Sequence, residues 1–191
     1  MPNVPQVQAV EQQAGVPWSE RHLLQMAIGV VAFAGMTALG AEIRIPLPGT
    51  PVPLTLQTLF VLLAGAALGP LGGGISQALY LTLRAAGIAG FAVPGAGLAA
   101  LGGPTAGYLL GFVLAATVTG WLADRGPRRN LPWLLFSMVI GTVGVYVCGV
   151  AWLVWGWSLP VPLALLQGVF PFFLGDLLKV AAAACLARMA Q

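Results

Sequence analysis

Two charged residues near the end of the chain lie within a strongly apolar sequence. Asp176 and Lys179 occur in the run GDLLK, which apolar residues flank on both sides. A charge within a membrane span costs about 2.5–3.5 kcal/mol on insertion scales, and it usually serves function. The i, i+3 spacing places both side chains on one helix face. We expect Asp176 to accept N–H bonds from a ligand and Lys179 to donate to a carbonyl or carboxylate. A buried pair that only fixes packing is the alternative.

A second group of polar residues lies on one face of a helix expected over 75–87. Gln77, Tyr80 and Arg84 follow the i, i+3, i+7 progression of that face. We expect these side chains to contact the ligand, although Gln77 could instead bond a neighbouring helix and Tyr80 could anchor at the membrane interface. Arg84 is close to the helix end, so its side chain either extends to water or pairs with an anionic ligand head or Glu42.

Two further polar residues each open an expected span. Gln57 follows a proline-rich loop, and Tyr108 follows a glycine-rich loop. Both are expected to face the same outer vestibule and to line the ligand site. Each is more weakly indicated than Asp176, because a polar residue at a span end is common.

Composition defines the class of protein that must position these residues. Of the 191 residues, 59% are hydrophobic and 7% are charged, whereas soluble domains have about 45–50% and about 25%. The chain is therefore expected to be an integral membrane protein. With 2 cysteines and 1 histidine, it lacks the residues for a metal centre or an intramembrane enzyme. A dispersed net charge of +3 does not indicate nucleic-acid binding, and no cofactor is expected.

The apolar runs predict an all-α protein with six transmembrane helices and two structured outer loops. A span needs about 20 residues, so six spans leave no room for a soluble domain. Residues 21–191 are therefore expected to form a single domain after a polar tail at 1–20. The outer loops, 42–54 and 88–104, are rich in proline and glycine and must fold against the bundle, because lipid-exposed irregular backbone leaves amides unsatisfied. A tight turn is expected at 69–74. The predicted spans are 23–41, 54–68, 75–87, 105–123, 131–155 and a last one, kinked or begun at Pro171, that ends near 188.

The distribution of arginine predicts the orientation of the chain in the membrane. With six spans, the side that holds both termini carries more arginines than the other side. Because cytoplasmic loops are enriched in Lys and Arg, we expect both termini in the cytoplasm and the two structured loops outside. The side of the termini holds Arg21, Arg125, Arg128, Arg129 and Arg188, and the other side holds Arg44 and Arg84.

Two other features bear on partners. Ala34 and Ala38 lie four apart on the first span, where small residues either pack tightly within the chain or form a docking face for another membrane protein. The only lysine, Lys179, is followed by Val180, so the chain has no GxxxxGK[ST] phosphate loop. If the protein moves a solute uphill, a partner or an ion gradient must supply the energy.

The chain resembles the biotin-specific substrate-capture components of energy-coupling factor (ECF) transporters, the BioY family. The similarity extends over residues 23–190, and the IPLPGTPVPLTLQ stretch is highly specific. The resemblance implies a six-helix ECF S-component-like fold in the bacterial cell membrane and high-affinity capture of biotin from the outer face. The matching runs are AEIRIPLPGTPVPLTLQTLFVLLAGAALGP (41–70), SQALYLTLRAAGIAGF (76–91), GGPTAGYLLGF (102–112) and GDLLK (175–179).

The resemblance also implies partners. A transmembrane coupling subunit (EcfT or BioN type) and paired ATP-binding subunits (EcfA or BioM type) would drive uptake, within the lipid membrane. A solitary biotin transporter that needs no coupling subunit is the alternative. In related proteins the region of Ala34 and Ala38 docks the coupling subunit.

The family motifs imply roles for individual residues. The matching GDLLK places Asp176 and Lys179 in the biotin site, with the two outer loops as its lid. Gln57, Tyr80 and Tyr108 match family motif positions. This chain departs from the family at Arg84, where relatives usually have glycine, and in the AVPGAG stretch at 92–97.

Overall fold

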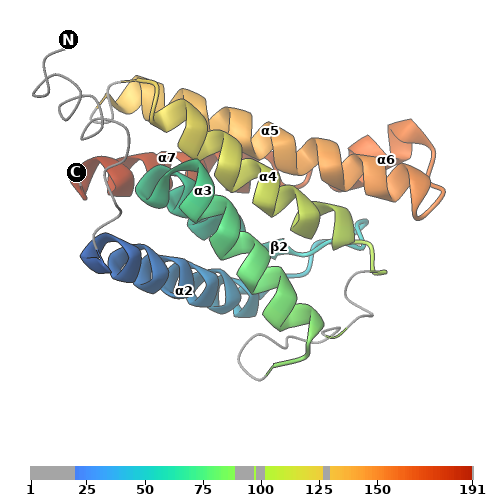
Figure 1. Cartoon of the computed structure of the whole chain (residues 1–191). Coiled ribbons are helices and arrows are strands. Elements are labelled where there is room, and N and C mark those ends of the chain that lie inside the picture. Colours follow the sequence, from blue (N-terminus) through green and yellow to red (C-terminus); the bar gives the residue numbers. More distant parts are fainter. Residues whose placement is uncertain (1–19, 89–96, 98–101, 127–129, 191) are drawn as a thin grey trace, which may run out of the picture.

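A computed structural model describes residues 20–88, 97, 102–126 and 130–190 of the chain. Within these residues the protein is helical apart from one short two-stranded ribbon (Figure 1). The predicted tail at 1–20 lies outside them except for Glu20, which begins the first described helix. The elements are α2 (Glu20–Glu42), β1 (Arg44–Ile45), β2 (Leu54–Thr55), α3 (Gln57–Ala85), α4 (Ala106–Ala123), α5 (Leu131–Trp155), α6 (Val161–Gly168) and α7 (Phe173–Met189).

The helices have the length and surface of membrane spans. Helices α2, α3, α4 and α5 are each long and apolar enough to cross a membrane, and α6 with α7 forms a fifth, bent pair. Large apolar side chains point outward, with Ile28 60%, Leu178 66% and Phe170 70% exposed. Apolar surface of this extent suits lipid rather than water. The chain is a multi-pass helical membrane protein, as its composition predicts.

Helix α3 reverses direction at Gly69, so it consists of two helical segments. Gly69 has φ 73° and ψ −175°. This backbone conformation is not helical, and its positive φ favours glycine. A Cβ atom on Gly73 would lie 2.8 Å from the Cα atom of Gly65. Residues this far apart along a straight helix are separated by about 12 Å, so the two segments fold against each other. The predicted reversal is confirmed, but it uses Gly69 alone, because the following residues of the expected turn at 69–74 are helical.

The last predicted span is broken rather than continuous. Helices α6 and α7 meet at an angle of 51°, and Pro171 lies in the break between them. Proline lacks the N–H that helix continuation needs and disfavours helical backbone at the residue before it. The predicted spans at 23–41, 105–123 and 131–155 agree closely with α2, α4 and α5.

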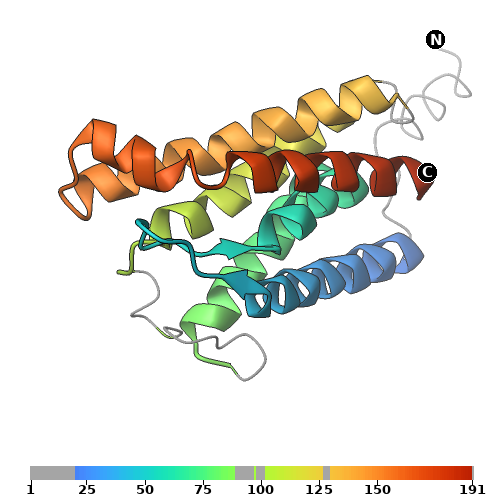
Figure 2. The ribbon, with the colours of Figure 1, turned by 180° about the vertical axis from the view of Figure 1, so that it is seen from behind.

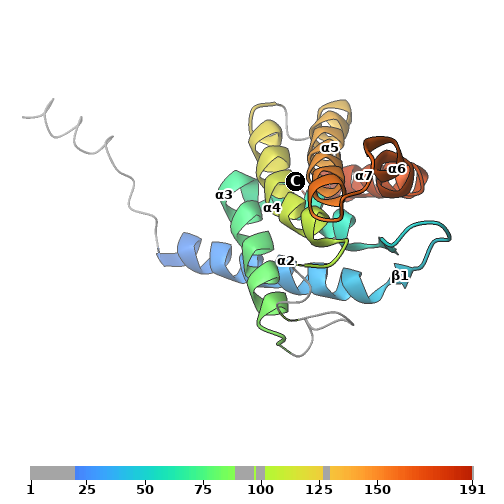
Figure 3. The same cartoon turned by 90° about the vertical axis from the view of Figure 1, so that its right-hand side faces the viewer.

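Helix α4 lies between α3 and α5 in the centre of the bundle (Figure 3). Its small residues allow close approach of the neighbouring backbones. A Cβ atom on Gly107 would overlap the carbonyl group of Cys148 on α5, and one on Gly120 would overlap the backbone at Gly69. Contacts this close between membrane helices are typical of small-residue interfaces. Helix α4 therefore holds the two helices on either side of it in fixed positions.

The proline-rich loop predicted at 42–54 is more regular than expected. Strand β1 pairs antiparallel with β2, with Arg44 opposite Thr55 and Ile45 opposite Leu54. The proline-rich segment between the strands turns at Gly49, which has φ 80°. Figure 2 shows this ribbon between α2 and α7. The start of α2 and the end of α7 lie at the same end of the bundle in Figures 1 and 2.

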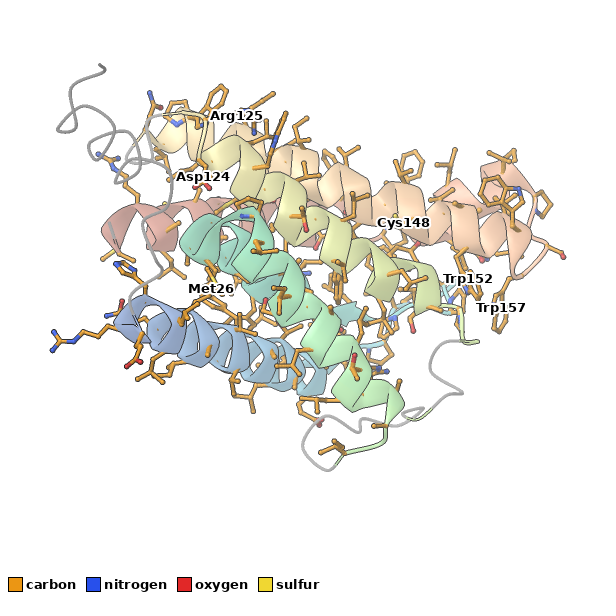
Figure 4. All side chains as sticks on the ribbon, viewed as in Figure 1. Met26, Asp124, Arg125, Cys148, Trp152 and Trp157 are labelled. Atoms are coloured by element: carbon orange, nitrogen blue, oxygen red, sulfur yellow. The ribbon has the colours of Figure 1, made fainter. Side chains whose placement is uncertain are left out.

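The glycine-rich loop predicted at 88–104 lies mostly outside the described residues. Its described parts are held by hydrogen bonds. The N–H of Gly97 donates to the Arg84 carbonyl at 3.0 Å. The indole N–H of Trp152 donates to the Gly103 carbonyl at 2.9 Å, and the indole of Trp157 donates to the Gly102 carbonyl at 3.3 Å. Both tryptophans lie at the same end of the bundle in Figure 4, so this end anchors the loop.

Candidate binding site

A cavity of about 300 Å³ lies between the β1–β2 ribbon and the helices. This volume is at the lower end of the range for small-molecule sites. Every described helix except α6 contributes to its wall, and the break before α7 contributes Phe172. The polar and charged lining residues are Arg44, Thr55, Gln57, Thr58, Arg84, Thr105, Tyr108, Tyr146, Asp176 and Lys179.

One wall of the cavity is built around the carboxylate of Asp176. Lys179 Nζ lies 2.7 Å from Asp176 Oδ1, which confirms that the two residues share a helix face. The Thr58 hydroxyl donates to Oδ1 at 3.1 Å, and the Tyr146 hydroxyl donates to Oδ2 at 2.6 Å. Asp176 is 6% exposed. Three donors therefore compensate this buried charge, as buried carboxylates require.

The local fold places this carboxylate at a favourable position. Asp176 lies in the first turn of α7, where the positive end of the helix dipole stabilises an anion. Its backbone N–H donates to the Phe172 carbonyl at 2.8 Å. The break between α6 and α7 thus brings a helix N-terminus to the cavity wall. Irregular backbone at membrane depth is tolerated where it lines a cavity.

A second wall contains two arginines and the amide of Gln57. Gln57 Nε2 donates to the Tyr80 hydroxyl at 2.7 Å, and Gln57 Oε1 accepts from the Thr55 hydroxyl at 3.1 Å. Arg84 Nη1 lies 3.5 Å from the same Tyr80 oxygen. Arg84 is only 8% exposed, so the alternative in which it extends to water is wrong. Arg44 on β1 completes this wall.

Tyr80 and Gln77 do not line the cavity, contrary to the prediction of ligand contact for both. Each is fully buried, at 0% exposed. The Tyr80 hydroxyl accepts hydrogen bonds from the lining residues Gln57 and Arg84. Gln77 bonds the Ser76 hydroxyl at 3.0 Å and lies about 10 Å along the helix axis from Arg84. The helical face was predicted correctly, but at the level of Gln77 it packs against the protein.

Tyr108 lines the cavity with its ring, while its hydroxyl is used elsewhere. That hydroxyl donates to the carbonyl of Gly168 at 2.8 Å. Gly168 is the last residue of α6, so Tyr108 links α4 to the α6–α7 break. Tyr108 is part of the cavity lining, and its contact with a ligand stays a prediction. Its hydrogen bond positions the helix break.

Sequence reasoning missed several lining residues. Tyr146 and Thr58 bond Asp176 directly. Arg44 entered the sequence analysis only as one of the arginines that predict the orientation of the chain in the membrane. The sequence carries a signal for Tyr146, because the chain has only 3 tyrosines and the other two, Tyr80 and Tyr108, are predicted site residues. Thr58 offered no comparable signal, since threonine is common in membrane helices.

The predicted docking residues are inside the protein. Ala34 is 0% and Ala38 is 3% exposed, and both belong to the central apolar cluster that includes Val61 and Tyr80. The prediction that they form a docking face for a partner is therefore wrong in this conformation. Their small size serves the packing of α2 against α3, which was the alternative interpretation.

These features define a multi-pass helical membrane protein with a cavity of small-molecule size that polar and charged side chains line. The chain belongs to the BioY family, whose model matches residues 11–191. It is 38% identical over 162 residues to the probable biotin transporter BioY of Pyrococcus horikoshii, covering 85% of this chain and 93% of that protein. It is 39% identical over 155 residues to the biotin transporter BioY of Thermotoga maritima, covering 81% and 89%.

A solved structure has the same fold. The crystal structure of an S-component for biotin from an ECF-type ABC transporter superposes with a TM-score of 0.83 and covers 90% of this chain and 93% of that chain. The two sequences are 22% identical. The predicted S-component-like fold is therefore supported by a match over nearly the whole chain.

Proposed function

We propose that this chain is the biotin-capturing S component of an ECF-type vitamin uptake transporter. The observation that carries the proposal is the buried Asp176 carboxylate in the cavity of a BioY family member. The relatives named as biotin transporters and the fold shared with an S-component for biotin support it. In this role the chain binds and delivers a ligand, needs no cofactor and catalyses no reaction.

Biotin matches the Asp176 wall chemically. Its ureido ring offers two N–H donors and one carbonyl acceptor on an apolar bicycle. Asp176 accepts a ureido N–H, and Lys179 donates to the ureido carbonyl once the ligand competes for its ammonium group. Apolar lining residues then cover the bicycle, with about 25 cal/mol gained per Å² of apolar surface buried. These residues include Val52, Leu109, Phe112 and Phe172.

Energy for uptake comes from partner subunits. The sequence has no phosphate-binding loop, so partner ATP-binding subunits hydrolyse the nucleotide and a membrane coupling subunit links them to this chain. The solved S-component comes from such an assembly, which favours this arrangement over a solitary transporter. We further propose six spans, with the two segments of α3 counted separately and α6 and α7 as one. Both termini are then cytoplasmic, in a bacterial cell membrane, as the arginine distribution predicts.

Ligand binding by the purified protein tests the proposed function. Asp176→Asn keeps the size of the side chain but removes its charge, and it should weaken the binding of labelled biotin at least tenfold, because a hydrogen bond to a charged group is worth about 1.5–3 kcal/mol. Asp124→Asn is the matched control, since Asp124 lies outside the cavity lining. Equal affinity of both variants and wild type would contradict the role of Asp176.

Uptake in cells separates partner-dependent transport from solitary transport. Biotin accumulation by cells that express this chain should require the coupling and ATP-binding subunits. Robust accumulation in cells that lack all coupling subunits would favour the solitary transporter instead. Release of captured biotin by an ATP-hydrolysing complex, but not by the isolated chain, would support the proposed partnership.

A further inference from the structure

The charges that line the cavity are not balanced. Arg44, Arg84 and Lys179 contribute three positive charges, and Asp176 contributes one negative charge. Lys179 is paired with Asp176 at 2.7 Å. Among the described residues, neither arginine makes an ion pair. Glu42, the acidic residue closest to Arg44 in the sequence, is exposed. The unbalanced positive charge therefore lies on the wall formed by the two arginines.

Arg84 is the most costly of these unpaired charges. Its guanidinium group stays charged at any ordinary pH, and the residue is only 8% exposed. Its Nε atom is buried and has no hydrogen-bond partner among the described residues. Within the part of the chain that the structure describes, the guanidinium group makes one hydrogen bond, from Nη1 to the Tyr80 hydroxyl, and it is long at 3.5 Å. A buried charge without a counter-ion is unfavourable unless a ligand completes it.

We propose that Arg84, assisted by Arg44, forms an anion subsite that binds the free carboxylate of the ligand and makes the protein select ligands that end in a carboxylate. This inference rests on the proposed function, with biotin as the ligand. The N–H groups on Nε and Nη of a guanidinium form a planar fork that matches the two oxygens of a carboxylate. The unpaired Nε of Arg84 is one arm of that fork.

The position of Arg84 separates this subsite from Asp176. Arg84 lies in the last turn of α3, whereas Asp176 lies in the first turn of α7. Arg84 and Gln57 both bond the hydroxyl of Tyr80. Asp176 is bonded by a different set of side chains, those of Lys179, Thr58 and Tyr146. Both residues line the same cavity, so we expect a ligand with a hydrogen-bonding head and a carboxylate at its far end to contact both walls.

The surrounding hydrogen bonds hold Arg84 in place. Its carbonyl accepts the N–H of Gly87 at 3.1 Å and the N–H of Gly97 at 3.0 Å, which fixes the end of the helix. Gln57 bonds the Tyr80 hydroxyl from the opposite side at 2.7 Å. The helix end that carries Arg84 and the Tyr80 hydroxyl beside it are therefore fixed before the ligand arrives, which reduces the entropy lost on binding.

The test compares biotin with biotinamide, in which a neutral carboxamide replaces the carboxylate. Binding of both to the purified full-length protein in lipid nanodiscs is measured by isothermal titration calorimetry. Wild type should bind biotin about 10- to 100-fold more tightly than biotinamide, the range expected for a hydrogen bond to a charged group. In Arg84→Gln this ratio should fall below about threefold, while the affinity for biotinamide changes little.

Further variants assign the effect to the guanidinium group. Arg84→Lys keeps the charge without the fork, so its ratio should be intermediate. Arg125→Gln, at an exposed residue that stacks on Trp121 with its Cζ atom 3.4 Å from the ring centre, should leave the ratio unchanged.

Each outcome decides a separate point. A wild-type protein that binds both ligands equally would overturn the anion subsite while leaving the proposed function intact, and this comparison needs no variant to fold. An unchanged ratio in Arg84→Gln, or an equal loss of affinity for both ligands, would also overturn it, because the second result indicates a structural role. A wild-type protein that binds neither ligand would overturn the proposed function and this inference with it.

Discussion

The two charged walls of the cavity differ in how fully their polar atoms are bonded. Asp176 receives hydrogen bonds from Lys179, Thr58 and Tyr146. Arg84 has one long bond to Tyr80 and a buried Nε without a partner among the described residues. Both residues are buried to a similar extent, at 6% and 8% exposed. The difference therefore lies in their partners rather than in their access to water.

This difference indicates two strategies for binding one ligand. The Asp176 wall is assembled in advance by three helices, so the ligand must compete with bonds that already exist. The arginine wall is incomplete, so the ligand supplies a missing counter-charge. Removing the central charge should consequently have opposite effects on the stability of the ligand-free protein at the two walls.

The largest effect is expected for Asp176→Ala. This change leaves the Lys179 ammonium group buried without its counter-charge, with its side chain about 10% exposed. Breaking a buried pair from one side costs about 3–5 kcal/mol, so the melting temperature in detergent should fall sharply. The double variant Asp176→Ala, Lys179→Met should recover much of the loss. If the single and double variants melt at the same low temperature, the ion pair is not the cause.

A smaller loss is expected for Tyr146→Phe. The substitution keeps the ring and removes the hydroxyl that donates to Asp176 Oδ2 at 2.6 Å. The buried carboxylate would lose one of its three donors, at a cost of about 1.5–3 kcal/mol. Thermal unfolding in detergent measures this change, and biotin affinity should fall with it. Stability equal to that of wild type would mean that Tyr146 does not support the carboxylate.

The sequence predicts the residues of the first wall better than their partners. Asp176 and Lys179 stand out because charges are rare in this chain, and their spacing fixes their relation along one helix. Tyr146 and Thr58 come from α5 and α3, and their contact with Asp176 depends on how these helices pack. No periodicity within a single segment contains that information.

The fold shows the same division between local and tertiary information. Long apolar runs predict α2, α4 and α5 closely, and Gly69 is within the predicted turn. The break between α6 and α7 was only half anticipated, because Pro171 is compatible with either a kink or a helix start. The burial of Ala34 could not be predicted either, since a small residue suits an internal helix contact and a partner interface equally.

At the arginine wall we expect a gain in stability. Arg84→Met removes an uncompensated buried charge and fills its space with an apolar side chain, so the ligand-free protein should be stabilised by about 1–2 kcal/mol. Saturating biotin should reverse the order, because wild type gains more from ligand binding. Thermal melting with and without biotin measures both effects.

The control is Arg125→Met, because Arg125 is exposed and the change should alter stability by less than about 0.5 kcal/mol. Destabilisation of ligand-free Arg84→Met would contradict the contrast between the walls.

The smallest effect concerns the rim of the cavity, by which we mean its lining residues Gly103, Pro104 and Thr105. Trp152 donates its indole N–H to the carbonyl of Gly103, and Gly103 lines the cavity. Trp152→Phe keeps an aromatic ring but releases this bond, which is worth about 0.5–1.5 kcal/mol. If the bond holds the rim in place, the dissociation rate of biotin should rise by about two- to tenfold, and the association rate should change less. Trp155→Phe is the matched control, since Trp155 is 83% exposed. A stopped-flow chase of labelled biotin measures both rates. Equal dissociation rates for the two variants would mean that the rim is held by other contacts, so that retention depends on the two charged walls alone.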